Sequence, residues 1–142
     1  METHNSYISL RTAKILKRLG FHWECHACYQ NNELREFTIS HDSHQTLVMD
    51  YNKVVDYMDL LSAPTLAVAQ RWFREEKNIA IDIKSNKQGN YDFMVHRINM
   101  VDYTLPSVLC VSACKFNTYE EALENGIQNA LVPLLNDEKE EA

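Results

Sequence analysis

The stretch from Ser62 to Lys77, SAPTLAVAQRWFREEK, is the most strongly punctuated amphipathic segment of the chain. Ser62 is a candidate N-cap, and Pro64 stands in the first turn, where the N–H that proline lacks would have no helical partner. Apolar residues then recur at helical spacing, and charged or amide residues occupy the other face. The pattern predicts a helix with one buried face, which the following segments must cover.

Alternation with period two follows this helix directly. From Asn78 to Lys84 (NIAIDIK), isoleucines alternate with smaller or polar residues, as in a half-buried strand. Gly89 and Asn90 are suited to a turn into a second alternating segment, Tyr91 to Ile98. Val108 to Phe116 is the expected third strand. Together these segments predict an antiparallel meander.

A second amphipathic helix is expected from Thr118 to Leu131. Thr118 and Glu121 have the spacing of a capping box. Pro133 is expected to end the helix near Val132. Gly126 lies within the apolar stripe. A glycine there predicts that the helix approaches the sheet closely.

The N-terminal part predicts a helix and a hairpin. The helix runs from Ser9 to Leu19, and Gly20 can end it in a left-handed conformation with a Schellman motif. Phe21 to Tyr29 alternates like a strand. The turn QNNE at residues 30–33 then leads into Leu34 to Ile39, because asparagine tolerates positive φ.

Length and composition favour one folded domain. The chain has 142 residues with 45% apolar and 24% charged residues, and its three glycines and three prolines leave no low-complexity linker. We expect a single α+β domain over residues 1–135, with antiparallel hairpins packed against two or three amphipathic helices. Residues 136–142 are expected to form a frayed acidic tail, and Thr46 to Leu61 stays ambiguous between strand and helix.

The chain is expected in the cytoplasm of a bacterial host. No apolar run is long enough to span a membrane, and the N-terminus lacks the basic and apolar regions of a secretion signal. Four cysteines without such a signal favour free thiols over disulfides.

A basic face on the first predicted helix suggests nucleic-acid binding as one alternative. No acidic residue lies between Tyr7 and Gly20, and the face carries Arg11, Lys14, Lys17 and Arg18. The net charge of -6 argues against a general nucleic-acid binder, and a solvated helix face is the favoured interpretation of the pattern.

Metal binding is the second alternative. Thiols and imidazoles suit a tetrahedral zinc site, and the candidates are Cys25, Cys28, Cys110 and Cys114 with His22 and His26. On a regular strand, however, Cys25 and Cys28 would point to opposite faces, so these cysteines are expected to act as small buried hydrophobes. His41, Asp42 and His44 form a weaker candidate in a polar loop. We expect no cofactor.

The polar face of the Ser62 helix is the favoured place for a protein partner, at Arg71, Arg74 and Glu75. Trp72 beside the two arginines suggests base stacking, but its position next to the apolar stripe favours core packing. The chain has no phosphate-binding glycine loop and no nucleophile elbow.

The motifs SAPTLAVAQRWFREEK and YEEALENGIQNAL resemble a family of short uncharacterised phage and prophage proteins. That family pairs an "APT...QKWLRE" helix with a C-terminal "YEEALEAGLQEAL" helix, although this chain has Phe73 where leucine is usual. The C-terminal strands and helix are also similar to the partial RNase H-like fold of HicB-type antitoxins. The first resemblance implies a mobile-element origin and no mechanism.

The sequence therefore predicts a small non-enzymatic accessory protein of a phage or mobile element that acts through an unknown protein partner. A nucleic-acid-associated regulator and a zinc-binding protein remain the alternatives. The oligomeric state is left open.

Overall fold

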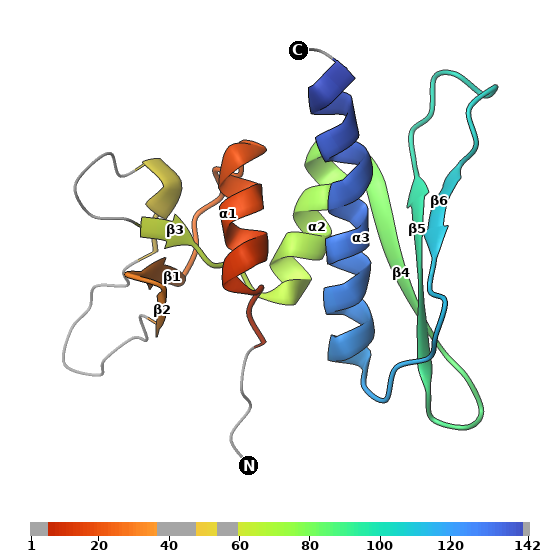
Figure 1. Ribbon diagram of the computed structural model, residues 1–142, viewed down its shortest axis with the longest axis horizontal. Coiled ribbons are helices and arrows are strands. Elements are labelled where there is room, and N and C mark those ends of the chain that lie inside the picture. Colours follow the sequence, from red (N-terminus) through yellow and green to blue (C-terminus); the bar gives the residue numbers. More distant parts are fainter. Residues whose placement is uncertain (1–5, 37–47, 54–59, 141–142) are drawn as a thin grey trace. The chain divides into compact units, whose positions relative to one another are not determined.

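The computed structural model describes residues 6–36, 48–53 and 60–140 (Figure 1). The chain divides into two compact units, Met1–Thr65 and Leu66–Ala142. Each unit contains one three-stranded antiparallel sheet and helical structure, so the α+β class with hairpins packed against helices is confirmed. The single domain over residues 1–135 stays a prediction. Within the described residues, every helix is too short or too polar to cross a membrane.

The first unit contains one helix, three short strands and a 3₁₀ turn. The elements are α1 (Leu10–Arg18), β1 (Ala27–Gln30), β2 (Glu33–Glu36), η1 (Tyr51–Lys53) and β3 (Leu60–Ser62). The sheet has the order β2-β1-β3, so its central strand pairs with one strand adjacent in sequence and with one distant strand.

The predicted signals at both ends of α1 are confirmed. The Ser9 hydroxyl accepts a hydrogen bond from the Thr12 backbone N–H at 3.2 Å. At the other end Gly20 has a φ of 92°, and the Phe21 N–H donates to the Leu16 carbonyl at 2.9 Å. These bonds satisfy backbone groups that a helix end leaves open, as a Schellman motif does.

The β1–β2 hairpin is also confirmed. Asn31 and Asn32 form its two-residue turn, with φ values of 52° and 67°, and Gln30 pairs with Glu33. Positive φ at both central residues is the requirement of the turn that matches strand twist. Phe37 and Ile39, which were predicted to extend the second strand, lie outside the described residues.

The long strand predicted from Phe21 to Tyr29 is wrong in extent. A bend at His26 separates β1 from Cys25, which makes an isolated bridge to Met49. Because the bend interrupts the alternation, Cys25 and Cys28 are both buried. The side chain of Asn52 connects distant parts of the unit. Its Nδ2 group donates to the Phe21 carbonyl at 2.8 Å, and its Oδ1 atom accepts from the Ser62 N–H at 2.9 Å.

Ser62 is not the N-cap of the central helix. It belongs to β3, where it pairs with Cys28, and the helix α2 runs from Leu66 to Glu76. Local capping preference is overridden here by pairing with a strand more than thirty residues away. Leu61, which could have belonged to a helical stripe, also lies in β3, whereas Val54, Val55 and Met58 lie outside the described residues.

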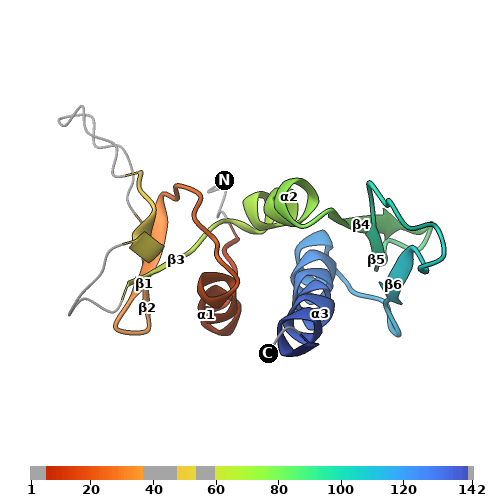
Figure 2. The same cartoon turned by 90° about the horizontal axis from the view of Figure 1, so that it is seen from above.

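The second unit has the order α2, β4 (Ile79–Ser85), β5 (Tyr91–Arg97), β6 (Val108–Val111) and α3 (Tyr119–Glu140). Its strands form the predicted meander in the order β4-β5-β6. The long helix α3 lies along one face of this sheet in both views (Figures 1 and 2) and contacts all three strands. Trp72 and Phe73 of α2 are buried, so the core role predicted for Trp72 is confirmed.

Gly126 confirms the predicted close approach of α3 to the sheet. A Cβ atom at this position would stand 2.7 Å from Cγ2 of Ile81 and 3.3 Å from Cβ of Phe93. Those distances leave no room for a methyl group without movement of the sheet residues.

Pro133 does not end α3, which continues to Glu140. Residues 136–140, which were expected to fray, are therefore helical. A proline inside a helix removes one backbone hydrogen bond, and apolar contacts of the following residues can offset that loss so that the helix continues. Leu134 and Leu135 are half-buried, and Leu134 lines a hollow of about 340 Å³ together with Pro133 and Leu109.

Candidate functional site

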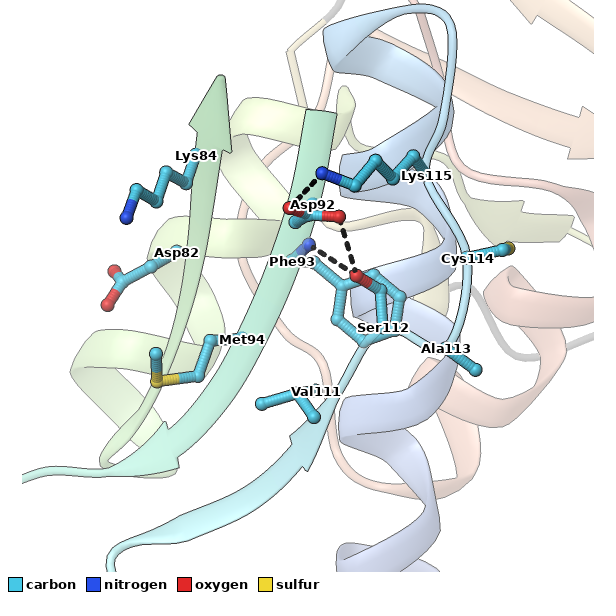
Figure 3. A pocket seen from close by; sticks show the side chains of 10 residues that line it. All are labelled: Asp82, Lys84, Asp92, Phe93, Met94, Val111, Ser112, Ala113, Cys114 and Lys115. Atoms are coloured by element: carbon cyan, nitrogen blue, oxygen red, sulfur yellow. Dashed lines mark hydrogen bonds and ion pairs between the residues drawn. The ribbon is translucent and has the colours of Figure 1, made fainter. Parts of the chain in front are cut away.

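A groove of about 620 Å³ lies on the face of the second sheet turned away from α3 (Figure 3). We call it the sheet groove. Alternation in antiparallel strands directs Phe93 and Val95 toward α3 and leaves Met94 on the open side. Met94 and Val111 are cross-strand partners, and they form the apolar floor with exposed fractions of 40% and 59%.

The wall of the groove is formed by residues 112–115, which leave the regular ladder. β5 pairs at Met94 with Val111 and next at Tyr91 with Phe116, so two residues of β5 oppose four residues of the other segment. Ser112 bridges this irregularity, because its hydroxyl accepts from the Phe93 N–H at 3.2 Å. The extra residues arch away from the sheet, and Cys114 lies exposed on the arch.

Charges of both signs surround the apolar floor. Asp82 is 2.6 Å from Nε2 of His96, and Asp92 is 3.9 Å from Nζ of Lys115. The Ser112 hydroxyl also lies 3.4 Å from Asp92. Lys84 has no ion-pair partner within the residues described, so it is the available cation of the rim. The groove can therefore hold an apolar side chain with a carboxylate beside it.

Exposed apolar side chains are concentrated between residues 101 and 111. Val101 and Tyr103 in the β5–β6 loop are 95% and 88% exposed, and Leu105 and Val108 follow at 48% each. Asp102 orders this loop, because it accepts bonds from the Thr104 hydroxyl at 2.6 Å and from the Thr104 N–H at 2.9 Å. The same bonds lower the pKa of the Asp102 carboxyl below its usual value. Tyrosine is enriched at protein-interaction surfaces, so this loop is a further candidate for contact with a partner.

The partner surface predicted on α2 is exposed and partly paired within itself. Arg71 and Glu75 form an ion pair at 2.8 Å across one helical turn, and Arg74 is exposed beside them. An exposed pair of this kind contributes only about 0.3–0.5 kcal/mol to stability. None of the three residues lines the sheet groove.

The predicted basic face on α1 is exposed to solvent. Arg11, Lys14, Lys17 and Arg18 are all exposed, and α1 contains no acidic residue in its first turn. Nζ of Lys17 lies 3.3 Å from the Leu60 carbonyl, so this lysine is partly engaged within the unit.

The predicted zinc site does not form in the part of the chain that the structure describes. There, no three His, Cys, Asp or Glu side chains gather closely enough to hold a metal ion. Cys25 and Cys28 belong to the first unit, whereas Cys110 and Cys114 belong to the second. His22 instead lies 3.2 Å from Asp50, and His26 is exposed. The loop candidate formed by His41, Asp42 and His44 lies outside the described residues.

Burial explains why the cysteines of the first unit are poor ligands. It raises the pKa of the Cys25 thiol to about 12, and the neighbouring Asp50 carboxylate adds to the rise. Burial also raises the pKa of Cys28 and raises the pKa of Tyr51 to about 12. Metal ligation needs the thiolate, which these surroundings disfavour.

Sequence reasoning did not predict the sheet groove. Val108 to Phe116 was treated as one strand, but β6 ends at Val111 and the next four residues form the wall. The run SACK, with small and polar residues after the apolar VLCV, is the signal that could have marked the end of the strand.

Comparisons with models of protein families, with curated protein sequences and with solved structures find no match to this chain.

Proposed function

We propose that this chain is a small non-enzymatic accessory protein that binds another protein through the sheet groove. The supporting observation is the groove itself, with an apolar floor at Met94 and Val111 and with Lys84 on its rim, a lysine that has no ion-pair partner among the residues that the structure describes. Apolar anchors surrounded by polar groups are the usual construction of protein-binding surfaces.

The partner that fits this groove presents an apolar side chain followed closely by a carboxylate. The apolar side chain covers Met94, and the carboxylate pairs with Lys84. Asp82 and Asp92 have partners of their own in His96 and Lys115, so Lys84 is the rim group that can receive the carboxylate of the partner.

The experiment compares affinity capture by the full tagged chain and by two variants, Met94→Glu and Lys84→Glu. Both side chains are exposed, so the variants are expected to fold, and circular dichroism checks this. We expect a specific partner to be captured by the wild type and reduced at least about tenfold in each variant, a loss of about 1.4 kcal/mol. Lys87→Glu is the matched control, because Lys87 is exposed but does not line the groove. Equal capture by all four proteins would contradict the proposal.

A phage or mobile-element origin in a bacterial cytoplasm is part of the proposal and is supported by the two helix motifs quoted above. Capture from infected and uninfected host lysates tests it. A partner found in infected cells, or a host protein that phage growth depends on, is the expected result. A partner unrelated to infection would count against this origin.

The second candidate function is nucleic-acid binding through α1, which the exposed Arg11 and Lys14 favour. It predicts binding to duplex DNA or RNA at low salt, with a slope of log K against log salt of roughly −3 to −4 if four phosphates are contacted. Replacing Arg11, Lys14, Lys17 and Arg18 with glutamine should abolish this binding. Replacing Arg35 and Lys53, which are exposed in the same unit, should not. The absence of binding at low salt would eliminate this candidate.

A further inference from the structure

The two edges of the second sheet differ in how they are protected. At the β4 edge, the side-chain amide of Gln70 in α2 donates to the Ile81 carbonyl at 2.6 Å. At the β6 edge, no described strand pairs with the outer side of Val108–Val111. This strand also carries neither a charge nor a proline, which are the usual means of keeping an edge strand from pairing.

The backbone groups that face outward from β6 can be identified from its bonds to β5. Ser107 accepts from the Arg97 N–H at 2.7 Å, and the Ser112 N–H donates to the Phe93 carbonyl at 3.0 Å. Adjacent residues of an antiparallel strand alternate between bonding inward and outward. Val108 and Val111 therefore direct their N–H and C=O groups away from β5.

A β-bulge sets the spacing of these outward groups. Val95 pairs with Cys110 and His96 pairs with Val108, so Leu109 is an extra residue in β6. Without a bulge, outward-facing residues are two positions apart, but Val108 and Val111 are three apart. An ordinary extended peptide does not match this spacing. A second β6 strand, read in the antiparallel direction, does.

We propose that β6 pairs with β6 of a second copy of this chain to form a symmetric dimer. Val108 of each copy lies opposite Val111 of the other, and each such pair exchanges two backbone hydrogen bonds. The four valines then lie on the open face of a continuous six-stranded sheet, where their half-exposed side chains pack across the two-fold axis. An isologous contact of this kind closes after two copies.

Charge complementarity tests the register. Like charges directly opposite one another on neighbouring strands are destabilising, and opposite charges are favourable. A chain with Val108→Lys and Val111→Lys would place lysine against lysine twice, and so would the corresponding double glutamate variant with glutamate. In a chain with Val108→Lys and Val111→Glu, each lysine would lie against a glutamate of the other copy.

Sedimentation velocity of the full chain over a concentration series measures the outcome, and circular dichroism confirms that each variant is folded. We expect a dimer for the wild type and at least a tenfold weaker dimer for the double lysine and double glutamate variants. Mixing these two variants should restore a heterodimer, and the lysine–glutamate chain should dimerise by itself. Val101→Lys in the neighbouring loop is the matched control and should leave the dimer unchanged.

A wild type that stays monomeric at all concentrations would overturn the dimer. A dimer that persists in both like-charge variants, or a lysine–glutamate chain that stays monomeric, would overturn the pairing through Val108 and Val111. The inference goes beyond the proposed function. Val111 also belongs to the floor of the sheet groove, so the two proposals are separated by the variants Met94→Glu and Lys84→Glu, which leave Val108 and Val111 unchanged. These two variants are expected to lose partner capture and to keep the dimer, whereas a wild type that dimerises without capturing a partner would contradict the proposed function alone.

Discussion

The two sheets of this protein have the same number of strands but are constructed by different means. In Met1–Thr65 the strands are three or four residues long, and β1 pairs with β3 from a distant part of the sequence. In Leu66–Ala142 the strands β4 and β5 have seven residues each, are consecutive, and lie against a 22-residue helix. Both units have an apolar core, but the core of the second unit is formed by a long helix on a regular sheet, whereas the short strands of the first unit are also connected by the side chain of Asn52.

The two units also differ in their interiors and in the surface that each leaves open. In the first unit the half-buried Asn52 side chain bonds to two backbone groups that are distant in sequence, so hydrogen bonds add to the packing of its apolar core. The second unit buries apolar side chains on one face of its sheet and leaves the other face open, which is where the sheet groove lies. The proposed partner site therefore belongs to the unit whose sheet has an open face.

The largest predicted effect compares two fully buried phenylalanines, Phe21 in the first unit and Phe73 in the second. Truncation of a buried phenylalanine to alanine costs about 3–5 kcal/mol. We expect Phe73→Ala to reach the upper end of this range, because the long helix and strands around it cannot collapse into the cavity. Phe21→Ala should fall near the lower end. Urea unfolding measures both, and an equal loss would show that the two cores are equally rigid.

Alkaline pH should destabilise the first unit selectively. The pKa of Cys25 is raised from 9.0 to about 12 in the folded chain, so only the unfolded chain loses this proton as the pH rises past 9. The stabilisation is complete below pH 9 and is lost progressively toward pH 12, by up to about 1.4 kcal/mol per pH unit. Tyr51, with a pKa raised from 10.0 to about 12, acts in the same direction.

The two tryptophans, Trp23 and Trp72, report on the two units separately. Urea titrations followed by Trp23 fluorescence in a Trp72→Phe chain should show a midpoint that falls through this pH window. The midpoint should fall less steeply when Cys25 is replaced by alanine. A midpoint that does not change with pH would contradict the effect of thiol burial.

Asn52→Ala should cost about 2 kcal/mol, because it leaves the Phe21 carbonyl and the Ser62 N–H without their partner. Gln88→Ala is the control, since Gln88 is an exposed amide residue in the turn between β4 and β5 and its backbone is not in the left-handed region. We expect its effect to stay below about 0.5 kcal/mol. Similar costs for the two variants would show that polar bonding does not hold the first unit together.

Gly126→Ala should cost about 1 kcal/mol. Overpacking against Ile81 costs about 1–3 kcal/mol, and the higher helix propensity of alanine returns about 1 kcal/mol. Gln128→Ala on the exposed side of the same helix should be neutral or slightly stabilising. Thermal unfolding compares them, and a stabilised Gly126→Ala chain would show that the sheet can move away from α3.

Features set by neighbouring residues could be predicted from the sequence, and features set by distant pairing could not. The Schellman end at Gly20, the turn at Asn31 and Asn32, and the meander after residue 78 each depend on a few adjacent residues. Ser62 was assigned to a helix because nothing nearby in sequence reveals its pairing with Cys28. Pro133 was predicted to end the helix because the apolar residues that surround the next helical turn are distant in sequence, so the sequence pattern does not reveal them.

The candidate site was the least predictable part of the molecule. Its floor and wall depend on the residue at which β6 stops pairing with β5. Lys84 can be recognised as the available cation only when the structure shows that Asp82 and Asp92 lie next to His96 and Lys115. The residues chosen from the sequence, Arg71, Arg74 and Glu75, remain a prediction for a partner surface. They were chosen because the helical pattern places them on an exposed face. A sequence pattern predicts exposure more readily than it predicts which residues line a groove.

The bulge at Leu109 also determines how β6 tolerates a change in length. Loss of one residue from a regular strand turns every side chain beyond it to the opposite face. Deletion of Leu109 would instead restore regular alternation along β6. The side chains of Val108 and Val111 would stay on the open face of the sheet, and the side chain of Cys110 would stay on the face that α3 covers. A loss of three nucleotides in frame should therefore be survivable at this codon, whereas the same loss within β4 or β5 would invert half of the sheet.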